Sequence, residues 1–227
     1  MGADASAAVP AGLPELAAVH WRRRVDRTAL ARSGRLWTLC TAAHTAPLIT
    51  TAGVLAALNP VTIPVGLILL GHAWAIPELY AARGAKVIRR RDVPDMEAEA
   101  VALGFLGDLV DHRARDLLCR SGMVLEQASL GVWLLACDGA LLVPAGGRRV
   151  HCYCVGVSDR GLPPSDRTAH LLLALREDEA GLATVANLAF AGAPWRLRRR
   201  LRGPARAALD EAVGLARRLT AHGQPSP

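Results

Sequence analysis

The hydrophobic and polar positions divide the chain into two contrasting parts. Residues 36–77 contain no Asp, Glu, Lys or Arg, whereas apolar and charged residues are mixed through most of the chain after residue 92. As one helix the uncharged stretch would be about 63 Å long, about twice the thickness of a bilayer core. The dipeptide Asn59-Pro60 in its middle is typical of a turn. The pattern therefore predicts two transmembrane helices, about 36–58 and 61–80, joined by a very short turn.

The alternative is a hydrophobic helical pair inside a soluble protein. Buried helices of soluble proteins rarely run this long without a charged face, so we favour the membrane hairpin. The first span contains several threonines, whose hydroxyls can bond to carbonyls of their own helix and so reduce the cost of burial. Small residues at four-residue spacing (Ala42, Ala46, Thr50) suit close helix packing, either within the hairpin or in a homo-oligomer.

Basic residues flank the uncharged stretch on both sides, and the turn between the spans carries no charge. The positive-inside rule then predicts that both termini are cytoplasmic and that the turn lies outside. An amino-acid composition rich in Ala, Arg, Gly and Pro is typical of a GC-rich bacterial genome. Together with the two predicted spans, it predicts a multi-pass protein of the cell (inner) membrane. The flanking residues are Arg22, Arg23, Arg24, Arg27, Arg32 and Arg35 upstream, and Arg83, Lys86, Arg89, Arg90 and Arg91 downstream.

The regions outside the spans differ in composition. The N-terminus is small and polar, the next segment is basic with Trp21, and the part after residue 92 has the mixed pattern of a folded domain. We expect a disordered segment at 1–12, a basic juxtamembrane helix at 13–35, the transmembrane hairpin at 36–82 with its turn at 59–60, and a cytoplasmic domain at 92–222.

The cytoplasmic domain is predicted to be α+β with a small antiparallel sheet. Residues 95–121 have helical periodicity, and residues 131–157 form an expected three-strand meander with a two-residue turn at Asp138-Gly139. A helix is expected after Pro164, with Ser165 or Asp166 as its cap. Residues 182–190 fit either a helix or a strand, and a last helix is expected after Gly203.

Two histidines, His44 and His72, lie at similar predicted depths in the two spans. Paired histidines can bind a metal or haem, or relay a proton, and Cys40 lies one helical turn before His44. A neutral imidazole bonded to a threonine or a backbone carbonyl is the simpler alternative, and we favour it because two helices offer no further ligand set.

The run His151-Cys152-Tyr153-Cys154 is the most conspicuous group of reactive residue types. A zinc site needs four ligands, usually as separated pairs, and here only Cys137 could join Cys152 and Cys154. We therefore favour core packing over thiol or metal chemistry and predict no metal and no cofactor. Asp108, His112 and Asp116 would share one face of a single helix, where local ion pairs are the simpler interpretation.

A cluster of arginines occupies residues 195–202 (Arg196, Arg198, Arg199, Arg200 and Arg202), and the net charge of the chain is +7. These charges favour anionic partners, and for a domain close to a bilayer the anionic lipid headgroup is a more accessible partner than nucleic acid. A basic helix exposed to solvent is the simplest alternative.

The sequence contains no P-loop, G-x-S-x-G elbow or G-x-G-x-x-G turn. The predicted strands GVWLLAC and ALLV lack the acidic residues of a metal-dependent phosphodiesterase. We therefore expect a membrane-anchored cytoplasmic binding or regulatory module without enzymatic activity. The alternative is a membrane-bound enzyme that uses thiol or metal chemistry around Cys152 and Cys154.

Overall fold

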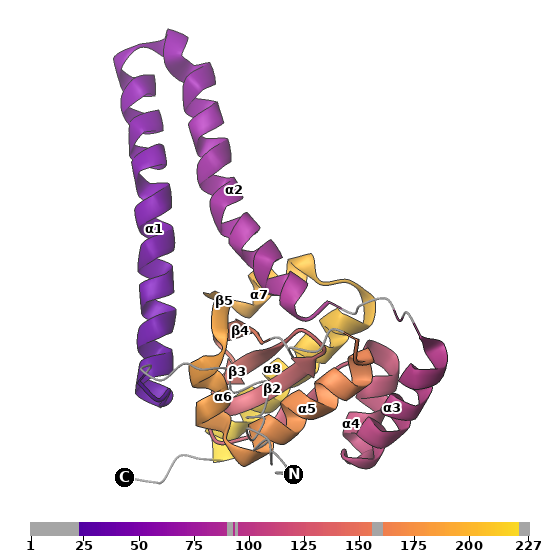
Figure 1. Cartoon of the computed structure of the whole chain (residues 1–227). Helices are drawn as coiled ribbons and strands as arrows, with labels where there is room; N and C mark the ends of the chain where they lie inside the picture. Colours follow the sequence, from indigo (N-terminus) through magenta and orange to yellow (C-terminus); the bar gives the residue numbers. More distant parts are fainter. Residues whose placement is uncertain (1–22, 90–92, 94, 156–160, 223–227) are drawn as a thin grey trace, which may run out of the picture.

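Two long apolar helices extend away from the rest of the molecule in the computed structural model (Figure 1). Helix α1 (Arg27–Leu58) begins at the N-cap Asp26, whose carboxylate accepts a hydrogen bond from the backbone N–H of Ala29 at 2.6 Å. Asn59 ends α1, and a single 3-10 turn, η2 (Pro60–Thr62), leads into helix α2 (Ile63–Val87). The structure describes residues 23–89, 93, 95–155 and 161–222.

The prediction of two long apolar helices separated at Asn59-Pro60 is confirmed. The expected basic juxtamembrane helix differs in one respect, because α1 runs without interruption from Arg27. Residues 27–35 are therefore the first turns of α1 rather than part of a separate helix. Residues 1–22, which include the segment predicted to be disordered, lie outside the described residues.

The two helices lie closest near the turn and diverge toward the domain (Figure 1). Near the turn, an added Cβ on Gly66 would be in van der Waals contact with Ala52, 3.5 Å from its carbonyl oxygen, so the two helices approach closely there. At the domain end, the rings of Trp37 on α1 and Tyr80 on α2 meet between the helices, and α2 leans over the sheet (Figure 1).

Below the helix pair lies a five-stranded antiparallel sheet in which each strand pairs with the next in sequence. The predicted meander at 131–157 corresponds to its central strands, but the tight turn lies one residue earlier than expected. Ala136 pairs with Gly139, so Cys137 and Asp138 form the turn. The strands are β1 (Val124–Gln127), β2 (Gly131–Ala136), β3 (Gly139–Pro144), β4 (Val150–Cys154) and β5 (Asn187–Gly192).

Helices cover both faces of the sheet. One row of side chains, Leu134, Leu141, Cys152 and Phe190, belongs to the core shared with the C-terminal helix α8 and the end of α2. The alternate row packs under α5 and α6. The remaining helices are α3 (Met96–Asp108), α4 (His112–Ser121), α5 (Pro164–Glu177), α6 (Glu179–Val185), α7 (Pro194–Arg200) and α8 (Gly203–His222).

Three local expectations are changed by the structure. The helical region 95–121 is broken between Asp108 and His112, because the carboxylate of Asp111 accepts the N–H of Ala114 and starts α4. Asp108, His112 and Asp116 therefore do not share a single helix. Helix α5 has Pro163 as its N-cap residue rather than Ser165 or Asp166, and residues 182–190 divide between the end of α6 and the first part of β5.

The last turns of α2 enter the core of the domain. Ala81 and Ile88 are buried, and an added Cβ on Gly84 would lie 2.7 Å from Cβ of Phe190 on β5. Gly139 of β3 likewise lacks a side chain where α2 packs, since an added Cβ there would lie 2.3 Å from Cγ1 of Val87. Glycines at these contacts allow α2 to pack directly on the strands.

The substitution Gly84→Ala is expected to destabilise the domain by about 1–3 kcal/mol, because the added methyl group must displace Phe190. The matched control is Gly71→Ala on the same helix, where nothing lies within 4 Å and the added methyl favours helix. Thermal unfolding of both variants in detergent measures the difference. Equal stabilities would contradict the close packing of α2 on β5.

Candidate functional site

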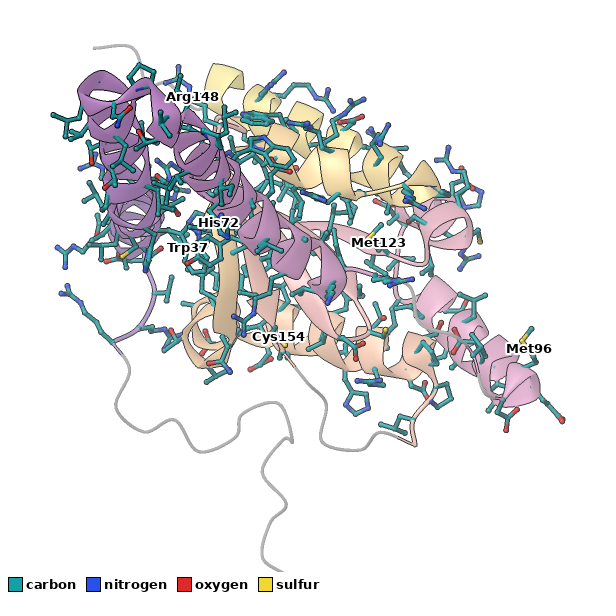
Figure 2. The ribbon with its side chains drawn as sticks, turned by 90° about the horizontal axis from the view of Figure 1, so that it is seen from above. Trp37, His72, Met96, Met123, Arg148 and Cys154 are labelled. Carbon is teal, nitrogen blue, oxygen red and sulfur yellow. The ribbon has the colours of Figure 1, made fainter. Side chains whose placement is uncertain are left out.

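A groove with a volume of about 670 Å³ lies between α1 and α2, above β5 and the start of α7. We call it the interhelical groove. In Figure 2, Trp37, His72 and Arg148 are labelled on the α1–α2 side of the molecule, and Met96 marks the opposite end. The walls of the interhelical groove include Thr41, Ala42, Thr45 and Ile49 on α1 and Leu70, Ala73, Trp74 and Pro77 on α2.

Aromatic side chains form the domain end of the groove. The rings of Trp37 and Tyr80 meet edge to face with centroids 5.9 Å apart, and Trp37 makes a similar contact with Phe190 at 6.3 Å. These contacts join α1, α2 and β5 where the helices have diverged. The cluster lies between the helices at this level, and Phe190 belongs both to the groove lining and to the domain core.

The α1 wall of the groove is less polar than its sequence suggests. The hydroxyls of Thr38, Thr41 and Thr45 each donate to the carbonyl four residues earlier, at 3.0, 2.8 and 3.1 Å. A hydroxyl that is already bonded needs no water or ligand partner. The part of the groove that lies between α1 and α2 is therefore suited to an apolar ligand.

Three arginines lie at the domain end of the groove, and we call Arg148, Arg149 and Arg196 the rim arginines. Arg149 donates through Nη1 to the carbonyl of Gly34 at 2.5 Å and to the hydroxyl of Thr38 at 2.9 Å. The guanidinium of Arg196 lies 5.3 Å from the ring centroid of Trp195. The groove lining contains no acidic residue, and within the described residues no ion pair involves a rim arginine.

The predicted arginine cluster is divided by its contacts. Arg198 pairs with Asp210 at 2.8 Å, and this hydrogen bond raises the pKa of Arg198. Arg200 lies 2.6 Å from the carboxylate of Glu78, and Arg199 lies 3.9 Å from it. Arg202 instead lines a neighbouring pocket on α2 together with Lys86 and Arg89.

Glu78 is a structural residue that the sequence did not single out. It is buried in α2 and links that helix to α7 through Arg200. The available signal was its position as the first charged residue after the uncharged stretch 36–77. A carboxylate at that position needs a cationic partner, because an unpaired buried charge is costly.

The two histidines predicted to lie within the spans, His44 and His72, do not form a joint site in the described structure. Nδ1 of His44 lies 2.6 Å from the carbonyl of Cys40, and Nδ1 of His72 lies 2.9 Å from that of Ile68. Each imidazole thus bonds to its own helix, and neither lines the interhelical groove.

The thiol candidates lie in three different environments. Cys152 is fully buried on β4, Cys137 is buried in the β2–β3 turn, and Cys154 is exposed at the end of β4. Burial raises the pKa of the Cys152 thiol well above its usual range, which keeps it protonated and unreactive. No group of three or more metal-ligating side chains occurs among the described residues.

His151 is a buried polar residue behind the groove. His151 is 1% exposed, and its ring stacks on that of Tyr153. An added Cβ on Gly34 of α1 would lie 3.3 Å from its Nε2, so the imidazole packs closely under α1. Burial lowers the pKa of His151 to about 4; a backbone hydrogen bond with Leu30 opposes this shift, and the charge of Arg149 adds to it.

Comparison with known proteins gives no relative for this arrangement: no family model, curated protein or solved structure matches the chain.

The buried neutral His151 predicts a pH-dependent loss of stability. Because its pKa falls from 6.5 in the unfolded chain to about 4 in the folded protein, its contribution is complete above pH 6.5. That contribution is lost as the pH falls toward 4 and amounts to about 3 kcal/mol in all. The melting temperature of the wild type should therefore fall more steeply than that of His151→Phe over this range. Parallel curves would show that His151 is not buried in its neutral form.

Proposed function

We propose that α1 and α2 form a transmembrane hairpin and anchor the rest of the chain as a binding module at the membrane surface. The observation that carries this proposal is the exposure of apolar side chains along both helices. Leu39 is 64% exposed, Leu67 63% and Trp74 62%, and only 6% and 11% of the most apolar 18-residue windows of α1 and α2 are buried. A helical pair in the core of a soluble protein would be covered by the protein itself.

The charges at the two helix ends support one orientation. Arg32 and Arg35 precede the uncharged stretch of α1, and Arg83 and Lys86 follow that of α2, while the turn at Asn59-Pro60 has no charge. By the positive-inside rule, the domain and both termini lie on the cytoplasmic side of the inner membrane of a bacterial cell. Trp195, which is 51% exposed and close to the guanidinium groups of Arg196 and Arg199, suits the membrane–water interface on this side.

The domain would be held rigidly at the surface rather than tethered by a linker. Helix α2 continues from the span into the core at Ala81 and Val87, and Arg200 of α7 bonds to Glu78 of α2. This arrangement favours a module that presents a fixed basic surface to anionic lipid headgroups. Nucleic acid is a less accessible partner for such a surface, and the exposed small residues of α1 leave room for a homo-oligomer.

A thiol or metal enzyme is the alternative with less support. Cys152 is buried and protonated, whereas Cys154 is exposed at the end of the same strand. A catalytic thiol needs access and a lowered pKa, and Cys152 has neither. The binding module is the function that the described side chains support best.

Extraction of membranes with alkaline carbonate tests the anchoring. The wild type should remain with the membranes and dissolve only in detergent. Leu67→Asp combined with Ile68→Asp should shift a measurable fraction into the carbonate supernatant, because each acidic residue costs about 3 kcal/mol at the centre of a spanning helix.

The matched control places the same acidic residues on the domain, at Met96 and Val101, which are 74% and 73% exposed. Met96→Asp with Val101→Asp should leave the extraction unchanged. Release of the wild type by carbonate or high salt alone would overturn the anchoring, and an equal effect of both double variants would show that the apolar surface of α2 is not in lipid.

A further inference from the structure

The interhelical groove has one cationic end and one apolar end. The rim arginines lie beside the domain, whereas Ile49 and Leu70 line the part farther along the helices. Since the lining contains no carboxylate, nothing in the groove itself neutralises the arginines. A ligand that matches both ends must carry an anionic group and an apolar chain.

The length of the groove matches one leaflet of a bilayer. Arg149 bonds to the hydroxyl of Thr38, and Ile49 lies about 16 Å farther along α1 at 1.5 Å per residue. Half of a bilayer core is about 15 Å. If α1 and α2 span the membrane as proposed above, the rim arginines lie at the cytoplasmic headgroup level and the groove opens along the acyl chains.

The three rim arginines offer guanidinium donors at the same end of the groove. Arg149 is fixed by its bonds to Gly34 and Thr38, and Arg196 lies over Trp195, while Arg148 is exposed. The planar guanidinium group presents paired N–H donors that fit the oxygens of a phosphate. The aromatic rings of Trp37 and Tyr80 would lie beside the glycerol region, at the depth that interfacial aromatics favour.

The apolar part of the groove does not by itself select a ligand. An acyl chain is already in an apolar medium in the bilayer, so it gains mainly packing contacts when it enters the groove. The bonded hydroxyls of Thr41 and Thr45 keep that wall free of unsatisfied polar groups. Selectivity must therefore come from the charge of the headgroup.

We propose that the interhelical groove binds one anionic phospholipid of the cytoplasmic leaflet. Its phosphate lies between the rim arginines, and one acyl chain runs between α1 and α2 past Ala42 and Ala73. The proposal rests on the proposed transmembrane hairpin and adds a specific lipid site to it.

Native mass spectrometry of the full chain in detergent, titrated with phosphatidylglycerol or phosphatidylcholine, tests the site. We expect the wild type to retain one phosphatidylglycerol with about tenfold or greater preference over phosphatidylcholine, since each arginine near an anionic headgroup adds favourable energy. Arg148→Gln with Arg196→Gln should abolish the preference. Both residues are outside the core, and Arg149, which holds α1, is left unchanged.

The matched control, Arg89→Gln with Arg202→Gln, removes the same charge from the neighbouring pocket on α2 and should keep the preference. A second variant, Ala42→Phe, fills the apolar part of the groove at an exposed position and should lower lipid retention while the arginines remain. An equal loss in the control, or full retention in Ala42→Phe, would overturn the site.

A competition arm with glycerol 3-phosphate distinguishes a lipid from a free anion. We expect no displacement of phosphatidylglycerol, because the soluble anion lacks the acyl chain. Displacement at a comparable concentration would show that the groove binds a phosphate group and not a lipid. Carbonate extraction of the same variants separates the two proposals. A protein that stays in the membrane but shows no headgroup preference rejects the lipid site and leaves the anchoring intact.

Discussion

The packing of the last turns of α2 on the sheet determines how the whole molecule is arranged. Gly84 lies against Phe190 of β5, and Val87 fills the space that Gly139 leaves on β3. Because the helix enters the core without a flexible joint, the apolar helix pair and the α+β domain form one structure. The divergence of α1 from α2, and with it the interhelical groove, follows from this contact and from the aromatic cluster of Trp37 and Tyr80.

Buried polar groups mark the boundary between the apolar helices and the domain. Glu78 bonds to Arg200, and Arg149 bonds to the carbonyl of Gly34, so charges that enter this layer are paired or hydrogen-bonded. His151 remains neutral beside them because burial lowers its pKa. Because the polar groups at this level are paired, hydrogen-bonded or neutral, one continuous helix can have an exposed apolar surface at one end and be buried in the protein core at the other.

Much of the architecture could be predicted from sequence because it depends on local patterns. The uncharged stretch 36–77, the dipeptide Asn59-Pro60 and the apolar strands after residue 131 each correspond to a described element. The errors arose where one hydrogen bond decides the outcome. Asp111 starts a new helix, and a shift of one residue moved the β2–β3 turn to Cys137 and Asp138.

The groove could not be predicted because its parts come from distant segments. Trp37, Tyr80 and Arg149 are far apart in sequence, and only the docking of α1 and α2 on β5 brings them together. The sequence drew attention instead to the run 195–202, in which three of the five arginines pair with Asp210 or Glu78. Residue type predicted the chemistry of this surface, whereas the tertiary contacts decided which charges remain available.

We propose that α1 and α2 cross a membrane with their turn on the far side from the domain. Labelling with a membrane-impermeant maleimide in spheroplasts tests it, after Cys40, Cys119 and Cys154 are changed to Ser. Val61→Cys, at a position that is 82% exposed beside the turn, should react in intact spheroplasts, whereas Met96→Cys, which is 74% exposed on α3, should react only after lysis. Labelling of Met96→Cys from outside, or of both positions only after lysis, would contradict the account.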